Sequence, residues 1–482
     1  MTTTARKPVI VVGSGLAGLS AAHEALRAGA PVHMVDRAPK PGGNSIKASS
    51  GINGAGTKFQ HDHGILKDES FYADTIRSAG DRLRAGPAGL DRQSIIETLT
   101  SQSAGAVHWL ADEVGVDLSV VAQLGGHSVP RTHRGAGKLP PGAAIVSTLL
   151  AKLKENPNFT LTNSAEVEAL LVGEGEEGAG TVTGVRYKGE DGQTSELVGP
   201  VVFAAGGFAG DAHGLLAQHR PDLAGMPSTN EARAAPHPLV GAVGAQFVDM
   251  ASVQIHPTAF VDPADPGSGY KFLAAEALRG EGGILLSGAD GARFVDELQT
   301  RDVVTAAVMA LPSADVGPTR QWNVSLLLDP GAYDAAASHV GFYLWKGLMK
   351  KQKVKELKPE VIASVDKYAA MVASGESDPL GRKAFGRWRL PPGETNREED
   401  VYVGTVTPVV HFTMGGVAFN TKAQALRTKN EKLEPISGLW VAGEIAGGVH
   451  GANRLGGSSL LMCAVFGRIA GTEAAKSLAA VQ

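Results

Sequence analysis

The chain has 482 residues, of which 43% are hydrophobic and 20% are charged, as in folded globular proteins and unlike disordered ones. Its length favours two domains over one. A formal net charge of −4 gives no electrostatic support for binding nucleic acid. The single cysteine, Cys463, excludes an internal disulfide and a cysteine-ligated iron–sulfur cluster, and no metal site is expected.

The N-terminus leads directly into a β-branched run, without the apolar region of a signal peptide. No uninterrupted apolar segment in the sequence is long enough for a membrane helix. We therefore expect a soluble, cytoplasmic protein with no membrane partner. An organelle is the alternative if a presequence has been removed.

A strand, a glycine-rich turn and a helix follow one another near the start of the chain. Residues 9–12 are β-branched and predict a buried parallel strand. The next glycines have G-x-G-x-x-G spacing, and a helical apolar pattern then runs to Gly29. Such glycines permit a tight turn, close approach of a pyrophosphate, and packing of helix against strand. The expected nucleotide contacts here are Gly13, Gly15, Leu16, Ala17 and Gly18.

The next segments indicate which nucleotide is bound. Residues 31–35 predict a second strand that ends at Asp36, where a carboxylate can accept hydrogen bonds from ribose hydroxyls. An acid there disfavours a 2′-phosphate and hence NADP. Residues 41–56, PGGNSIKASSGINGAG, contain Lys47 as their only ionisable residue, which suits a loop that wraps a pyrophosphate and runs beneath an isoalloxazine ring. An ordinary surface loop is the alternative. The expected cofactor contacts in this segment are Asn44, Ser45, Ser50 and Gly51.

Residues 441–460, VAGEIAGGVHGANRLGGSSL, form a second glycine-rich region. They include six glycines, one acid (Glu444) and one arginine (Arg454). Glycines let backbone N–H groups approach a flat or anionic ligand, and arginine offers a planar fork to a carboxylate or phosphate. Few acids lie near Arg454 in sequence, so a ligand carboxylate is its expected partner. We expect the two ends of the chain to meet at one cofactor.

Six segments carry a specific family resemblance. They are GGNSIKASSGINGAG, HPTAF, FLAAEALRGEGGILL, ELQTRDVVTAA, TPVVHFTMGG and GGVHGANRLGGSSLL. In this order they resemble the soluble fumarate reductases of the fumarate reductase/succinate dehydrogenase flavoprotein family, and most closely its haem-free fungal branch. The resemblance implies an α/β fold, in which a Rossmann-like, glutathione-reductase-like FAD-binding domain carries an inserted α+β capping domain. It also implies FAD-dependent reduction of fumarate to succinate.

The texture of the sequence changes between about residue 252 and residue 408. Polar helical patterns over residues 341–358 and 359–374 alternate there with loops rich in proline and glycine. We interpret this region as the capping domain that clamps the substrate. The expected division is residues 1–251 and 409–482 for the FAD-binding domain and residues 252–408 for the capping domain.

Other segments have narrower predictions. The basic run 350–358 has one glutamate and no aromatic residue, so a solvated helix face is expected rather than a surface for a membrane or an acidic partner. Residues 160–171 and 182–189 predict strands of the nucleotide domain, and residues 201–208 predict a buried strand that ends in a diglycine. For the basic, loop-like residues 122–142, the resemblance implies a place beside the flavin, and a basic surface loop is the alternative.

The resemblance assigns a proton-transfer group. Arg301 matches the arginine that donates the proton in fumarate reduction, and Glu276 with Arg279 matches its relay. The i, i+3 spacing of the latter two predicts one shared helix face. Without the resemblance, all three would be ordinary salt-bridging residues.

The substrate carboxylates are expected to be held by His256, His411 and Arg454. Histidine can donate to a carboxylate when neutral or protonated, so neither histidine needs a strongly shifted pKa. His127 and His450 are expected to be satisfied core residues. The resemblance implies further FAD contacts from Val167, Ala205, Gly206, Glu444, Ser459 and Leu460.

Three positions depart from the family pattern. Ala275 stands where bacterial members have a threonine that helps hold substrate, so one carboxylate contact is lost or moved. Asn44 lies nearest the place of the histidine that binds FAD covalently in succinate dehydrogenases, which implies non-covalent FAD and favours fumarate reduction. Residues 228–245 lack the family's Gly-Asp-Gly, and Pro236 and Pro238 have no N–H donors. We expect this last change to affect cofactor affinity or substrate choice.

Two other functions stay open from the sequence. One is a related FAD enoate reductase or dehydrogenase acting on a steroid, methacrylate or urocanate, although Arg454 with His411 favours a carboxylate and weighs against a steroid. The other is a degenerate relative that binds flavin or a partner without turnover, supported only by residues 228–245. The sequence has no haem motif, iron–sulfur ligands or second fingerprint for NADH. The expected electron donor is therefore a free reduced flavin or a redox partner.

Overall fold

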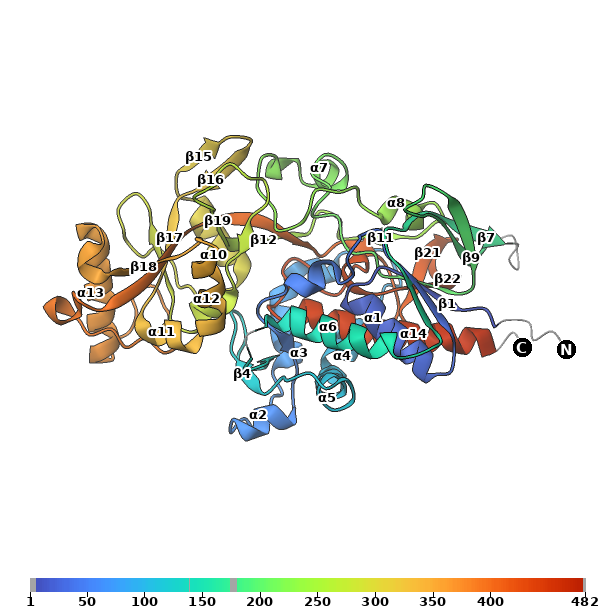
Figure 1. Ribbon diagram of the computed structural model, residues 1–482, viewed down its shortest axis with the longest axis horizontal. Coiled ribbons are helices and arrows are strands. Elements are labelled where there is room, and N and C mark those ends of the chain that lie inside the picture. The colour runs from blue at the N-terminus through green and yellow to red at the C-terminus, as the bar shows by residue number, and fades with distance from the viewer. Residues whose placement is uncertain (1–5, 138, 174–179, 480–482) are drawn as a thin grey trace.

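A computed structural model describes residues 6–137, 139–173 and 180–479, so Lys138 of the basic block lies outside the described residues. The molecule has two lobes along its long axis (Figure 1). The first lobe carries both ends of the described chain, and the second is built mainly from residues 253–413. Each lobe has its own hydrophobic core.

The first lobe is organised by a six-stranded sheet with the order β21-β22-β10-β1-β2-β6. The five strands from β22 to β6 pair in parallel, and β21 adds an antiparallel edge. β1 therefore lies two strands from β22, which joins the beginning of the chain to its end as expected. The strands are β1 (Val9–Val12), β2 (Val32–Val35), β6 (Phe159–Thr162), β10 (Val201–Phe203), β21 (Gln424–Lys429) and β22 (Lys432–Val441).

Two long helices pack together against this sheet (Figure 1). They are α1 (Leu16–Arg27) and α14 (Ser458–Ala479). Glycines at one-turn spacing on α14 allow the close approach, since a Cβ at Gly467 would lie 2.4 Å from the carbonyl oxygen of Ala17, and one at Gly471 would lie 2.0 Å from that of Ala21. The contact fixes the segment before α14 relative to the glycine turn before α1.

The rest of the first lobe consists of three small sheets and short helices. The sheets contain β3 (Ile52–Asn53), β5 (Thr132–Arg134) and β4 (Val120–Ala122); β7 (Glu166–Gly173), β8 (Thr181–Lys188) and β9 (Thr194–Val198); and β11 (Phe247–Val248) with β20 (Gly416–Val417). The helices are α2 (Lys58–Asp62), α3 (Phe71–Ala79), α4 (Arg92–Ser101), α5 (Ser103–His108), α6 (Pro141–Lys154), α7 (Leu215–His219) and α8 (His237–Gly241). Short helical turns occur at η1 (Gly43–Lys47), η2 (Gly80–Arg84), η3 (Trp109–Val114), η5 (Pro221–Leu223) and η8 (Gly443–Ile445).

The second lobe is built on an antiparallel sheet with the order β13-β12-β19-β17-β14, and β18 also pairs with β19. β12 and β19, which are antiparallel, extend between the second lobe and the first (Figure 1). The strands are β12 (Val253–Phe260), β13 (Phe272–Leu273), β14 (Ile284–Ser287), β17 (Val324–Leu328), β18 (Lys350–Lys353) and β19 (Asp400–Thr413), with a separate pair β15 (Ser313–Val316) and β16 (Thr319–Trp322). The helices are α9 (Glu276–Gly280), α10 (Arg301–Met309), α11 (Pro330–Ala335), α12 (Ala337–Trp345) and α13 (Pro359–Ser374), with turns η6 (Val354–Glu356) and η7 (Gly393–Asn396).

The helix predicted over residues 341–358 is wrong beyond its first turns. α12 ends at Trp345, and Gly347 follows with φ +74°, a left-handed conformation that stops a helix. The basic run then forms β18 at the sheet edge, where Lys351 and Lys353 each bind Asp400 at 2.7 Å. The first four residues of the run are therefore an edge strand, and the short turn η6 (Val354–Glu356) follows. The helix predicted over residues 359–374 is confirmed as α13.

The basic block at residues 122–142 is not simply a surface loop, since residues 131–134 are buried and Pro140 lines the cofactor cavity; its place beside the flavin stays a prediction. Arg131 is completely buried, and its guanidinium binds Asp68 and Asp74, each with a shortest distance of 2.7 Å. These carboxylates come from a different part of the sequence, so the local composition of the block did not indicate burial. A buried arginine needs such partners to offset its desolvation.

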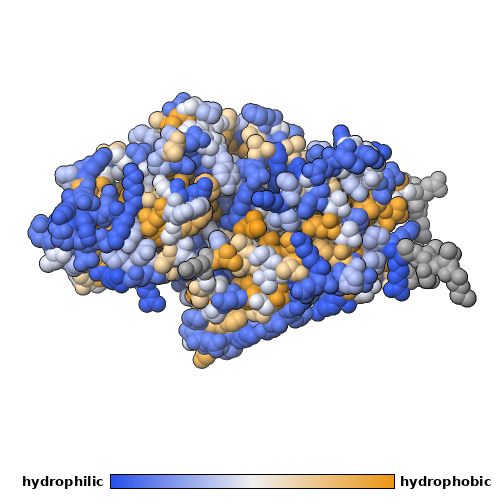
Figure 2. Space-filling view, viewed as in Figure 1, coloured by the Kyte–Doolittle hydropathy of each residue, from blue (hydrophilic) through white to orange (hydrophobic). Residues whose placement is uncertain are grey.

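The lobes correspond to the expected pairing of an FAD-binding domain with an insertion. The boundaries at residues 251/252 and 408/409 stay a prediction, and β19 crosses the second of them without a break. Hydrophilic side chains cover the end of the second lobe that carries α13, whereas apolar side chains gather on the surface between the lobes (Figure 2). Within the described part of the chain, every helix is too short or too polar to cross a lipid bilayer.

Candidate active site and cofactor cavity

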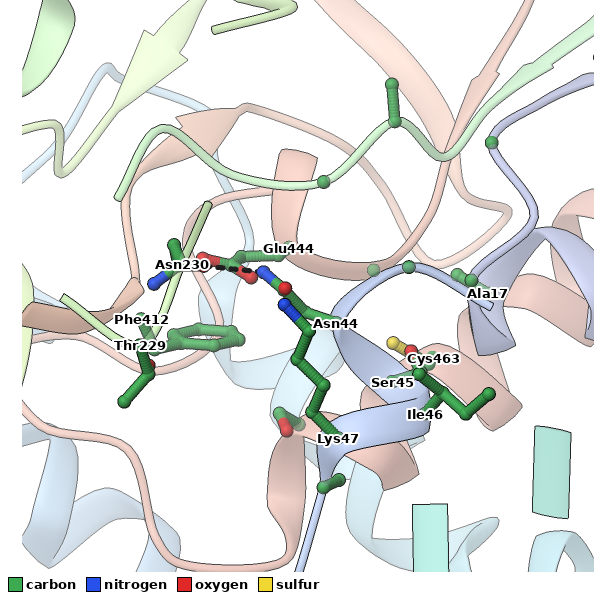
Figure 3. A pocket seen from close by; sticks show the side chains of 18 of the residues that line it. Ala17, Asn44, Ser45, Ile46, Lys47, Thr229, Asn230, Phe412, Glu444 and Cys463 are labelled. Carbon is green, nitrogen blue, oxygen red and sulfur yellow. Dashed lines mark hydrogen bonds between the residues drawn. The ribbon is translucent and has the colours of Figure 1, made fainter. Parts of the chain in front are cut away.

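A cavity of about 610 Å³ lies between the two lobes. Its walls come from the glycine turn before α1, the segment around η1, the end of β10, the C-terminal glycine-rich loop and the facing surface of the second lobe. In the close view, Asn44 and Lys47 of η1 point toward Asn230 and Glu444 on the other side (Figure 3). The cavity thus joins the segments that the sequence predicted to meet.

Most predicted cofactor contacts line this cavity. Those that do so are Gly13, Gly15, Ala17, Asp36, Asn44, Ser45, Ser50, Gly51, Val167, Ala205, Gly206, Glu444, Ser459 and Leu460. Leu16 and Gly18 do not line it. The Leu16 side chain is completely buried in the core, and its N–H donates to Ser45 Oγ at 3.1 Å. Gly18 packs on the glycine turn, where a Cβ would lie 1.9 Å from the carbonyl oxygen of Gly13.

The glycine turn is held in a fixed shape. Gly13 has φ +101°, and a Cβ there would lie 2.5 Å from the carbonyl oxygen of Ala204 at the end of β10, so only glycine fits. Asp36 Oδ2 accepts hydrogen bonds from the N–H of Ser14 at 2.7 Å and from its hydroxyl at 2.5 Å. The acid therefore braces the turn and also faces the cavity.

Arg301 stands at the other end of the cavity, at the start of α10. Its Nε donates to Glu276 Oε2 at 2.6 Å, and its Nη1 donates to Gln254 Oε1 at 2.9 Å. Burial alone would raise the pKa of Glu276, but the positive charges of Arg301 and Arg279 outweigh it and lower the pKa to about 2. Glu276 is therefore an ionised acceptor behind Arg301 at neutral pH.

Arg454 is a buried cation that no carboxylate binds within the described residues. Its Nη2 donates to Gln254 Oε1 at 2.9 Å, and its guanidinium carbon lies 4.4 Å from the centre of the Phe412 ring. Burial, followed by the charge of Arg301, lowers the pKa of Arg454 to about 9. An anion in the cavity would relieve both effects.

Two histidines complete this end. His411 lines the cavity, and its Nδ1 lies 3.0 Å from the hydroxyl of Thr229. The His256 ring lies 5.4 Å from the His411 ring, and it does not line the cavity. Burial, followed by the charge of Arg301, lowers the pKa of both histidines well below the ordinary value, so both are neutral at pH 7.

The predicted catalytic residues thus divide into two groups. Arg301, His411 and Arg454 line the cavity, whereas Glu276, Arg279 and His256 lie behind that wall. Glu276 and Arg279 share α9 as expected, but Arg279 Nη1 donates to the carbonyl oxygen of Glu297 at 2.6 Å. Arg279 therefore acts on Glu276 through its charge and not through a hydrogen bond.

Comparison with known proteins agrees with this geometry. Residues 8–460 match the family model described as the FAD binding domain. The chain is 41% identical to fumarate reductase 1 of Saccharomyces cerevisiae, over 96% of this chain and 97% of the relative. It is 40% identical to a fumarate reductase of Schizosaccharomyces pombe, over 99% of this chain and 91% of the relative. An open conformation of a flavocytochrome c3 fumarate reductase matches with a TM-score of 0.73 and 32% identity, over 99% of this chain and 79% of that chain.

The chain belongs to the FAD-binding-domain family. FAD is therefore its cofactor, and the expected α/β fold with an FAD-binding domain and a capping domain is confirmed. The cavity suits this flavoprotein family at both ends: the glycine turn closes one end, and the paired arginines stand at the other. Glu444 lines the same cavity and is half-buried, with its Oε1 accepting from the N–H of Thr413 at 2.9 Å.

Several residues of this flavoprotein site escaped the sequence prediction. Gln254 is buried at 3% exposure and accepts from both arginines, and its i, i+2 spacing from His256 on one strand is the signal that could have found it. Tyr343 lines the cavity, and its hydroxyl accepts from the Ala275 N–H at 3.2 Å and donates to the carbonyl oxygen of Leu273 at 2.9 Å. A hydroxyl group is thus present near the position where bacterial members have threonine.

The altered segment at residues 228–245 still supports the site. Asn230 Nδ2 donates to the carbonyl oxygen of His411 at 3.0 Å, and Asn230 Oδ1 accepts from Asn44 Nδ2 at 2.5 Å (Figure 3). Together with the contact of Thr229 to His411, this keeps the first three residues of the segment in place. The departure from the family pattern is therefore confined to the part after residue 230. His127 and His450 are both buried, and His127 is hydrogen-bonded as expected of a satisfied core residue. The Nε2 of His450 has no hydrogen-bond partner among the described residues, so that expectation is wrong for His450.

Proposed function

We propose that this protein reduces fumarate to succinate with FAD as its redox cofactor. The observation that carries the proposal is the pair of buried arginines at one end of the cavity, Arg301 and Arg454. Among the described residues, Arg301 binds one carboxylate, that of Glu276, and Arg454 binds none. Such a site has an unbalanced positive charge that a dicarboxylate can neutralise. The names and sequence identities of the two yeast relatives support the same substrate.

The proposal assigns a role to the residues that line this end of the cavity and to those directly behind them. Arg454 and His411 bind the carboxylates of fumarate, and His256 supports His411 from behind. Arg301 donates a proton to one alkene carbon, and a proton from solvent then passes to Glu276 and through its hydrogen bond of 2.6 Å to Arg301, which restores the guanidinium charge and leaves Glu276 ionised again. The charge of Arg279 keeps Glu276 ionised between turnovers. Reduced FAD supplies the hydride for the other alkene carbon.

The electron donor is external to this chain in the proposal. The one cysteine of the sequence cannot hold an iron–sulfur cluster. Among the described residues, no group of three or more His, Cys, Asp or Glu side chains could hold a metal ion. We therefore propose a free reduced flavin or a redox partner protein as the donor.

Two alternatives differ from this proposal in what they predict for the site. Another unsaturated carboxylate would use the same arginines, because they recognise a carboxylate and not the rest of the molecule. A flavoprotein without turnover would need a damaged site, whereas the contacts of Thr229 and Asn230 to His411 are present. The names of the two yeast relatives favour fumarate over the other unsaturated carboxylates.

The test is fumarate-dependent oxidation of a reduced viologen dye under anaerobic conditions, after the flavin content has been measured. We expect faster turnover with fumarate than succinate oxidation in the reverse assay, and the Arg301→Ala variant should keep FAD and lose turnover. Arg84→Ala is the matched control, since Arg84 is 88% exposed. Near-wild-type turnover of Arg301→Ala would refute the assignment of the proton donor, and turnover only with other unsaturated carboxylates would refute fumarate as the substrate.

A further inference from the structure

Two arginines line the nucleotide end of the cavity and have no assigned role. Arg37 follows Asp36 after β2, and Arg233 lies in the altered segment at residues 228–245. Arg37 Nη1 donates to the carbonyl oxygen of Ala234 at 3.0 Å, so the first arginine is tied to the segment that carries the second. In the part of the chain that the structure describes, neither arginine forms an ion pair.

The acids around these arginines bind other groups. Glu231 pairs with Lys47 at 2.9 Å, and Asp36 accepts from Ser14. The Oε1 of Glu444 accepts from the N–H and hydroxyl of Thr413, and Glu166 lines the same wall without forming an ion pair to either arginine. Burial, followed by the charge of Arg233, lowers the pKa of Arg37. The charges of Glu166 and Asp36 raise the pKa of Arg37 but do not restore it to its ordinary value. Two neighbouring cations that no carboxylate contacts as an ion pair among the described residues indicate a place for an anion.

The position of Arg233 relates it to the glycine turn. Arg233 Nη2 lies 3.7 Å from where a Cβ of Gly206 would stand. Gly206 lies two residues after Ala204, whose carbonyl oxygen would be 2.5 Å from a Cβ at Gly13. The guanidinium is therefore at the end of β10, next to the strand that leads into the turn before α1. The N-terminus of α1, a helix of 12 residues, borders the same cavity through Gly15 and Ala17.

We propose that Arg233, with Arg37 beside it, binds the pyrophosphate of FAD from the cavity wall at the end of β10, near the glycine turn. The pyrophosphate is the anionic part of this cofactor, and guanidinium groups bind phosphate oxygens with paired, charge-assisted hydrogen bonds. Pro236 and Pro238 line the cavity in the same segment but have no N–H to donate. Arg233 is thus the donor with which the altered segment contacts the cofactor.

The test measures binding and needs no turnover. Apoprotein is titrated with FAD and with riboflavin, which has the same isoalloxazine ring but no phosphate, and the quenching of flavin fluorescence gives the Kd for each. We expect Arg233→Gln to weaken FAD binding about 10-fold or more and riboflavin binding less than about 2-fold. The loss should shrink at high salt, because screening weakens the charge contribution in the wild type.

Matched variants separate charge from structure. Arg233→Lys should recover part of the FAD affinity lost in Arg233→Gln, because lysine retains the positive charge but not the paired hydrogen bonds of a guanidinium. Arg84→Gln, at an exposed arginine, should bind both ligands as the wild type does. An unchanged Kd for FAD in Arg233→Gln would overturn the proposal. An equal loss for FAD and riboflavin would also overturn it, since it would indicate a change in the shape of the cavity. Failure of fumarate reduction would leave these affinities untouched, so the two proposals are tested separately.

Discussion

Arg301 and Arg454 donate hydrogen bonds to the same atom, Gln254 Oε1, each at 2.9 Å. The amide Nε2 of Gln254 in turn donates to the carbonyl oxygen of Arg454 at 2.8 Å. One neutral side chain therefore holds two guanidinium groups together at the end of the cavity. The two positive charges repel each other because both guanidinium groups contact the same oxygen atom. An anion that binds beside them in the cavity would reduce this repulsion.

We predict that Gln254→Glu weakens substrate binding. The new carboxylate would neutralise the arginines in place of the substrate, so the KM for fumarate should rise about 10-fold or more while FAD stays bound. Steady-state kinetics with the viologen assay check this. Gln193→Glu is the matched control, because Gln193 is exposed in a turn far along the sequence from the site. An unchanged KM in Gln254→Glu would contradict the role given to the arginine pair.

Thr229→Val should reduce activity by loosening His411. The substitution keeps the shape of the side chain and removes the hydroxyl that lies 3.0 Å from His411 Nδ1. A net hydrogen bond contributes about 1 kcal/mol, so kcat/KM should fall about 5-fold. Thr229→Ser restores the hydroxyl and should restore most of the activity. If the serine variant is as impaired as the valine variant, the hydroxyl does not orient the histidine.

Arg454→Met should impair substrate binding without destabilising the fold, whereas Arg131→Met should destabilise the fold. Arg454 has no carboxylate partner within the described residues, so its loss strands no buried charge and should leave the melting temperature unchanged or higher. Its KM for fumarate should rise about 10- to 100-fold. Arg131→Met leaves Asp68 and Asp74 buried without their cation and should destabilise the fold by about 3–5 kcal/mol.

Differential scanning calorimetry of the two variants, with kinetics at a permissive temperature, checks this contrast. A large drop in the melting temperature of Arg454→Met would mean that the arginine is a structural ion-pair partner after all. Wild-type KM in that variant would remove Arg454 from the substrate site.

His237 should make stability depend on pH between about 4 and 6.5. Burial lowers its pKa to about 4, and both ring nitrogens are buried without a hydrogen-bond partner in the described structure. Because the unfolded chain takes up a proton first, the contribution of the neutral ring is complete above pH 6.5. It is lost as the pH falls toward 4, by about 2 kcal/mol at pH 5.

The substitution that tests this dependence is His237→Phe, which suits the edge-on contact with Phe208 at 5.2 Å. Its melting temperature should fall less than that of the wild type when the pH is lowered from 7.5 to 5. His213→Asn, at an exposed histidine, should follow the wild-type curve. Parallel curves for wild type and His237→Phe would show that His237 does not titrate in this range.

FAD should be released completely when the protein is denatured. Asn44 lines the cavity and carries an amide, which has no nucleophilic ring nitrogen to bond to the flavin. After acid precipitation, the flavin absorbance should therefore be found in the supernatant. A yellow pellet would mean a covalent link at another residue.

The sequence predicted the nucleotide half of the fold well because its signals are local. The β-branched run of β1, the glycine spacing and the acid after β2 each act through neighbouring residues. The sequence-based predictions were wrong where the local structure depends on residues far away in the sequence. Residues 350–353 became a strand because β19 offers them a sheet edge, and Arg131 is buried because Asp68 and Asp74 lie beside it.

The sequence by itself determined the family, the cofactor and the residue types of the site, since motifs of glycine, arginine and histidine carry that information in order along the chain. Only the tertiary structure decided which of these residues meet. Gln254 lies 47 residues from Arg301 and 200 from Arg454, and their contact depends on how β12, α10 and the C-terminal loop pack. The same packing brought Arg233 to the cofactor wall, because a local pattern specifies a turn or a strand but not its neighbours in space.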